Sequence, residues 1–153
     1  MTETQPSKRF RVTIISARVS GILMKDKILQ QDYFSQHVDF HIYGKTPEVG
    51  GTWFENRYRG YATSLEIQSY LKAVAQNYNL NPRISLNSRV EHALWDQDRG
   101  IWRVDIANYG IIESQILINA GGILNNPQMP GLRGMDTFNG PILHTAAWDH
   151  TLI

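Results

Sequence analysis

Residues 10–21 read Phe10-Arg11-Val12-Thr13-Ile14-Ile15-Ser16-Ala17-Arg18-Val19-Ser20-Gly21. The first six are mostly β-branched or apolar, which predicts a short strand, and a turn of small residues follows. The next stretch, 22–31, is compatible with a helix, and residues 38–43 alternate apolar and polar side chains as a second strand would. Together these segments predict a strand–helix–strand unit with a right-handed crossover.

The later part of the chain predicts one more helix and a series of strands. Thr63 and Glu66 form a capping box ahead of an apolar stripe that ends near Asn79, which predicts a helix. The expected strands are 84–86, followed by 90–95, 101–106 and 111–115, which turn-forming residues join into an antiparallel meander. Residues 116–118, Ile-Leu-Ile, predict a strand buried on both faces. The whole pattern predicts an α/β domain.

The composition is that of a globular protein. Of the 153 residues, 42% are hydrophobic and 19% charged, and the formal net charge of +1 argues against a nucleic-acid partner. The absence of cysteine excludes disulfides, thiol nucleophiles and thiolate metal sites, and the histidines have no metal-ligand spacing, so no metal is expected. Residues 1–9 are expected to be a flexible terminus. No apolar run is long enough to span a bilayer, so we expect a cytoplasmic protein without a membrane partner.

Three segments carry a recognisable pattern: Val49-Gly50-Gly51-Thr52-Trp53, Leu117-Ile118-Asn119-Ala120-Gly121-Gly122, and the spacing Phe-x-Gly-x-x-x-His-x-x-x-Trp-Asp at 138–149. In this order they resemble the Baeyer-Villiger-type flavin monooxygenases, over residues 10–150. The resemblance implies one FAD-binding, Rossmann-like domain with three layers, a parallel sheet and an added antiparallel β-meander. In that family a nicotinamide-binding domain begins where this chain ends, so we expect the domain and its NADPH site to be absent from this chain.

The resemblance also implies roles for particular residues. Gly21 would let the first helix pack on the first strand, and the residues expected to line or close over FAD are Gly50, Gly51, Thr52, Trp53, Gly121 and Gly122. His144 would act catalytically at the seam with the second domain. Two plainer interpretations stay open: the Gly-Gly-Thr-Trp segment as a turn with an anchoring aromatic residue, and His144 as a packing residue.

The dinucleotide motif departs from the family pattern at three positions. In Gly-x-Gly-x-x-Gly the first glycine permits a tight turn and the second lets the backbone approach the diphosphate, but here these positions hold Ser16 and Arg18. Arg18 is expected to obstruct the diphosphate, although its guanidinium could instead turn outward and pair with phosphate. Gly44 stands where the family has a glutamate for the ribose, a loss that weakens binding about 10- to 100-fold. We therefore expect that FAD, if it binds, is held weakly.

A further departure lies at residues 58–61, where the family has a longer segment with an active-site aspartate. We do not expect a full oxygenation cycle from this chain alone. The first hypothesis is a truncated FAD-binding monooxygenase of secondary metabolism. It would act on a hydrophobic ketone of polyketide or terpenoid class only with a partner chain that supplies the missing half, or it is inactive. The second is a cofactor-independent, pericyclase-like cyclase or isomerase that uses the vacated hydrophobic pocket. The third is a non-catalytic partner of an intact homologue, docked through the exposed domain seam; a decayed gene product also stays open.

Overall fold

The structure is a computed structural model that describes residues 9–55, 62–123, 127–144 and 146. Along the chain the elements are β1 (Phe10–Ile15), α1 (Val19–Leu29), α2 (Asp32–His37), β2 (Val38–Tyr43), α3 (Thr52–Glu55), α4 (Ser64–Asn77), the 3-10 helix η1 (Asn81–Arg83), β3 (Ile84–Ser85), β4 (Val90–Asp96), β5 (Ile101–Ile106), β6 (Gly110–Ser114) and β7 (Ile116–Asn119). The N-terminal segment 1–8, the shortened segment at 58–61 and Trp148-Asp149 of the third motif lie outside the described residues.

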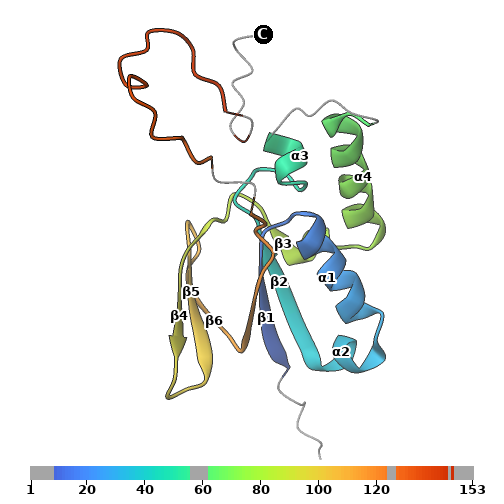
Figure 1. The fold of residues 1–153 in the computed structure, drawn as a ribbon. Coiled ribbons are helices and arrows are strands. Elements are labelled where there is room, and N and C mark those ends of the chain that lie inside the picture. Colours follow the sequence, from blue (N-terminus) through green and yellow to red (C-terminus); the bar gives the residue numbers. More distant parts are fainter. Residues whose placement is uncertain (1–8, 56–61, 124–126, 145, 147–153) are drawn as a thin grey trace, which may run out of the picture.

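Two sheets divide the strands between them. The parallel sheet has the order β3-β2-β1-β7, and the antiparallel meander has the order β4-β5-β6. β1 pairs with β2 from Phe10↔Val38 to Ile15↔Tyr43, and with β7 from Val12↔Ile116 onward. In Figure 1 the helices cover one side of the parallel sheet and the meander lies on its other side. The predicted three-layer α/β fold with an added meander is confirmed.

Each interface between layers has its own apolar core, as the alternation along β1 and β2 requires. Between the parallel sheet and the helices, the core of buried side chains includes Val12, Ile14, Ile22, Phe40, Ile42, Leu71, Ala75 and Leu80. Between the parallel sheet and the meander, the smaller core is formed by Tyr43, Val104 and Ile106. Successive residues of β1 and β2 therefore face different layers, and the odd-numbered ones face the meander.

The helix α4 is stabilised at its N-terminus by the predicted capping box. The side chain of Thr63 accepts from the backbone N–H of Glu66 at 3.2 Å, and the Glu66 carboxylate accepts from the backbone N–H of Thr63 at 2.7 Å. These two bonds satisfy donors that the first turn of a helix otherwise leaves free. The helix that they begin, α4, buries Leu71 and Ala75 against the sheet.

The structure corrects two local predictions. The expected helix 22–31 begins earlier, at Val19, ends at Leu29, and is followed by a second short helix, because Gln31 has extended backbone angles that interrupt the helical path. The strand at Ile116 is not buried on both faces: its first residue is 46% exposed. Within the described residues β7 has a strand neighbour on one side, β1, and stands at the edge of the sheet. No helix in the described ranges is long and apolar enough to cross a membrane.

Candidate nucleotide-binding site

The turn between β1 and α1 keeps a glycine-like conformation without a glycine at its start. Ser16 has φ +89°, in the left-handed region, and its N–H donates to the carbonyl of Tyr43 at 2.7 Å. A Cβ built on Gly21 would overlap the carbonyl oxygen of Ser16 and lie 3.5 Å from Ile14 Cγ2, so a larger residue does not fit there. The tight turn and the close helix–strand approach are thus both present, and Ser16 carries a backbone strain of about 1–3 kcal/mol.

Arg18 lies at the N-terminus of α1, and its side chain turns inward. The carbonyl of Arg18 accepts from Ile22 N–H at 2.9 Å, which begins the helix. A Cβ built on Gly51 would overlap the Arg18 side chain, including Cδ at 2.6 Å, and one built on Gly122 would lie 3.1 Å from Nη1. The guanidinium therefore reaches across the turn between these two glycines. Its Nη2 lies 3.2 Å from Oε2 of Glu55, and the side chain is 11% exposed.

Glu55 holds Arg18 in an ion pair, and it was not among the site residues predicted from the sequence. Its carboxylate also lies 3.0 Å from Lys45 Nζ, so two cations share one acid. The short helix α3 positions it, since the carbonyl of Gly51 accepts from Glu55 N–H at 2.9 Å. Glu55 comes four residues after Gly51, but this spacing does not predict that its carboxylate faces Arg18. An arginine at a motif position that usually holds glycine is a signal in the sequence for a carboxylate partner nearby.

Gly44, the third departure from the motif, is enclosed by its neighbours. A Cβ there would lie 3.0 Å from Ala17 Cβ and 3.4 Å from Leu86 Cδ2. Its N–H donates to Ser85 O at 2.8 Å, and its carbonyl accepts from Ser88 N–H at 2.8 Å. A glutamate at this position would require Ala17 to shift by a few tenths of an ångström, so the close packing here favours glycine.

The Gly-Gly-Thr-Trp segment packs directly beside the turn. Gly50 and Gly51 both have positive φ, at +119° and +56°, and Gly50 N–H donates to the carbonyl of Ala17 at 3.0 Å. Thr52 begins α3, and Trp53 packs against the core between sheet and helices. The segment is therefore both a turn with an anchoring aromatic residue and one wall of the space that Arg18 occupies.

The end of β7 supplies the opposite wall, and the hydrogen bond of His144 in the described part of the chain is to Ala146 rather than to this turn. Gly121 N–H donates to the Asn119 side chain at 3.0 Å, and Gly122 has φ +69° beside the Arg18 guanidinium. His144 Nδ1 accepts from Ala146 N–H at 3.0 Å. It ends the segment 127–144, which in Figure 1 loops out from the two sheets and returns toward α3. The structure thus brings together the turn, the two glycine pairs and Glu55.

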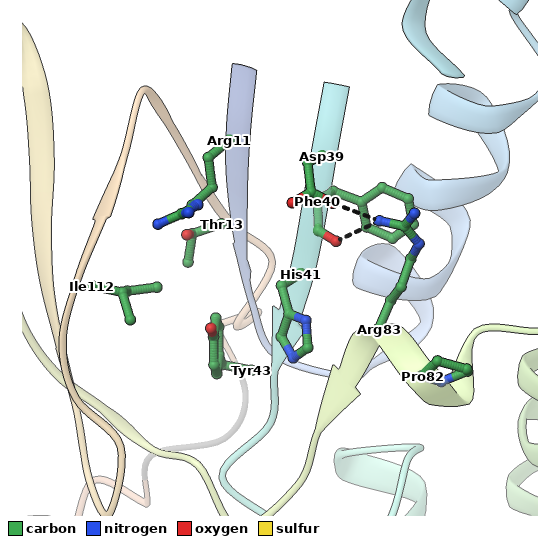
Figure 2. A pocket seen from close by; sticks show the side chains of 9 residues that line it. All are labelled: Arg11, Thr13, Asp39, Phe40, His41, Tyr43, Pro82, Arg83 and Ile112. Carbon is green, nitrogen blue, oxygen red and sulfur yellow. Dashed lines mark hydrogen bonds and ion pairs between the residues drawn. The ribbon is translucent and has the colours of Figure 1, made fainter. Parts of the chain in front are cut away.

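One cavity among the described residues lies on another face of the parallel sheet. It has a volume of about 420 Å³ and is lined by Arg11, Thr13, Asp39, Phe40, His41, Tyr43, Pro82, Arg83 and Ile112 (Figure 2). None of the motif residues lines it, so it is not a vacated flavin pocket. Burial lowers the pKa of His41; the charge of Asp39 opposes this shift and that of Arg83 adds to it. No group of three or more metal-ligating side chains occurs among the residues that the structure describes.

Comparisons with known proteins give consistent relatives. The chain is 33% identical to an FAD-binding monooxygenase of Aspergillus terreus over 168 residues, which cover 93% of this chain and 30% of that protein. It is 26% identical to a Baeyer-Villiger monooxygenase of Streptomyces coelicolor, over 95% of this chain and 32% of that protein. No protein-family model matches the chain.

Solved structures show the same likeness. Cyclohexanone monooxygenase with bound ε-caprolactone superposes with a TM-score of 0.77 at 25% identity, over 94% of this chain and 33% of that one. OTEMO, in complex with FAD and NADP, superposes with a TM-score of 0.76 at 25% identity, over 94% of this chain and 31% of that one. The chain spans about a third of the length of these relatives. By sequence and by fold, the chain is a homologue of about a third of an FAD-binding, Baeyer-Villiger-type monooxygenase.

Proposed function

We propose that this chain is a dinucleotide-binding fold of the Baeyer-Villiger monooxygenase type in which an internal ion pair, Arg18–Glu55, competes with the FAD diphosphate. In such folds the diphosphate lies at the N-terminus of the first helix, against the backbone of the preceding turn. Here that place holds the Arg18 side chain, which lies between Gly51 and Gly122. This single observation carries the proposal.

The ion pair sets the expected strength of the competition. A hydrogen bond between charged groups that are mostly buried contributes about 1.5–3 kcal/mol, and FAD must break the one between Arg18 and Glu55 to enter. That cost weakens FAD binding about 10- to 150-fold. The Glu55 carboxylate would also face the diphosphate if Arg18 moved away, which adds repulsion between like charges. The residues present do not fit FAD in this conformation, so we assign no redox step to the chain.

The opposite role for Arg18, as a phosphate ligand, has less support. A guanidinium that binds phosphate needs free N–H groups directed to the ligand, and this one is paired and 11% exposed. A cofactor-free reaction in a vacated flavin site has no observation in its favour, because the cavity lies on the meander side of the sheet. For a complete enzyme that contains this domain, we propose hydrophobic ketones as the substrate class, since two similar structures are those of a cyclohexanone monooxygenase and a steroid monooxygenase.

Thermal denaturation with and without FAD tests the proposal. A ligand that binds the folded state raises the melting temperature in proportion to the logarithm of its concentration over its Kd. We expect FAD to leave the melting temperature of the wild-type chain nearly unchanged at concentrations that stabilise a tight flavoprotein. A large rise, equal in the wild type and in Arg18→Gly, would show that the ion pair does not compete with the cofactor.

A further inference from the structure

The cavity on the meander side of the parallel sheet is independent of the nucleotide site. Figure 2 shows Arg11 and Thr13 of β1 and Tyr43 of β2 directed toward Ile112 of β6, in the space between the two sheets. These residues alternate along β1 and β2, so they share the face that looks toward the meander. The volume of about 420 Å³ lies within the range of small-molecule sites.

Two residues that line this cavity, Thr13 and Tyr43, are buried and carry hydroxyl groups. Thr13 is 1% exposed and Tyr43 is 7% exposed, and among the described residues neither side-chain oxygen has a hydrogen-bond partner. Buried polar groups in folded proteins are nearly always paired with protein, water or ligand. Burial, together with Tyr109, raises the pKa of Tyr43, so its phenol keeps its proton and can donate. Two potential donors therefore point into one space, and among the described residues neither is paired with an acceptor.

The cavity also has an excess of positive charge. Arg83 is paired with Asp39 at 2.8 Å, but Arg11 has no carboxylate partner among the described residues. Arg11 Nη1 donates to the backbone carbonyl of Glu113 at 3.2 Å, which holds the guanidinium at the cavity wall and leaves its other N–H groups available. The Glu113 carboxylate itself is occupied by Arg99, at 2.7 and 2.9 Å.

The remaining walls suit a flat apolar group. The ring centroids of His41 and Tyr43, which both line the cavity, lie 4.7 Å apart, and Tyr109, outside the lining, packs edge to face on Tyr43 with a centroid distance of 5.8 Å. His41 Nε2 is hydrogen-bonded to Ser85 Oγ at 2.8 Å, and this bond fixes the orientation of the imidazole ring. An apolar wall with a few convergent donors is the usual construction of a ligand site.

We propose that this cavity binds a small aromatic carboxylate, with the Arg11 guanidinium facing the carboxylate and the hydroxyls of Thr13 and Tyr43 donating to it. The ligand is an anion because the unpaired group is a cation and both unpaired hydroxyls can act as donors. It is small and flat because the rings of His41 and Tyr43 form part of the lining. The site does not depend on the proposed function of the nucleotide-binding turn.

Benzoate is the probe, with its neutral analogue benzamide for comparison, and binding is followed by amide chemical shifts of the whole chain. We expect saturable shifts at residues around Thr13 and Tyr43 with benzoate at up to about 10 mM, and at least tenfold weaker binding of benzamide. Arg11→Gln should weaken benzoate binding about tenfold, whereas Arg89→Gln, an exposed arginine outside the cavity, should leave it unchanged.

Thr13→Val separates the ligand role from a structural one. Because the hydroxyl is buried without a partner, its replacement by a methyl group should raise the melting temperature and at the same time weaken benzoate binding several-fold. A lower melting temperature, or benzoate binding equal to wild type in both Thr13→Val and Arg11→Gln, would overturn the proposal. So would the absence of benzoate-induced shifts at the residues that line the cavity.

Discussion

Replacement of Arg18 by glycine is expected to tighten FAD binding. The substitution removes the side chain that lies between Gly51 and Gly122, and it places a glycine where the motif has one. FAD then no longer has to break a mostly buried, charge-assisted bond of 3.2 Å, a gain of about 1.5–3 kcal/mol or about 10- to 150-fold in Kd. Titration of the wild type and Arg18→Gly with FAD, followed by flavin fluorescence, measures this ratio.

Two controls separate obstruction from a loss of folding. Glu55 retains Lys45 at 3.0 Å when Arg18 is removed, and glycine is tolerated just ahead of a helix, so unfolding should be easier by about 1 kcal/mol only. Arg18→Lys keeps a long cationic side chain and should bind FAD nearly as weakly as the wild type. If Arg18→Gly binds FAD more weakly than the wild type while folded, Arg18 is a phosphate ligand and the reasoning is refuted.

Three further predictions concern the turn, its neighbour and the cavity. Ser16→Gly should raise the free energy of unfolding by about 1 kcal/mol, measured with urea, because glycine accepts φ +89° without strain; no change would mean that the strain is absent. Gly44→Glu should lower it by about 1–3 kcal/mol and should not restore FAD binding, because its Cβ would press on Ala17; tighter FAD binding would contradict the packing argument. The free energy of unfolding of the wild type should fall as the pH drops below about 6.5, because burial lowers the folded-state pKa of His41 and the unfolded chain then binds more protons. His41→Gln should flatten urea stability curves between about pH 7.5 and pH 5.5, and an unchanged slope would exclude His41 as their cause.

The sequence predicted those parts of the fold that depend on local patterns. The strands β1, β2 and β5 have the predicted boundaries, and the capping box at Thr63 forms with both of its bonds, since each is encoded within a few residues. The exposure of β7 could not be predicted in this way, because it depends on which strands flank it in the sheet. The second short helix, α2, was likewise missed, because a single extended residue separates it from α1.

The motif positions of the candidate site could be picked out from the sequence, whereas the ion pair between Arg18 and Glu55 could not. Ser16, Arg18 and Gly44 could be singled out because the motif fixes their spacing. The carboxylate that holds Arg18 could not, because Glu55 comes from a distant segment and its direction depends on the tertiary fold. For the cavity a signal was present: polar residues alternate with apolar ones along the two predicted strands 10–15 and 38–43, and Thr13 is among the polar ones.

Gel filtration of the chain after incubation with excess FAD tests the central claim most directly. The protein peak is collected and its flavin content is read from the visible absorbance against the protein concentration. If the Arg18–Glu55 pair competes with the diphosphate, the wild-type peak should emerge nearly colourless and Arg18→Gly should retain measurably more flavin. A wild-type peak with one flavin per chain would contradict the account.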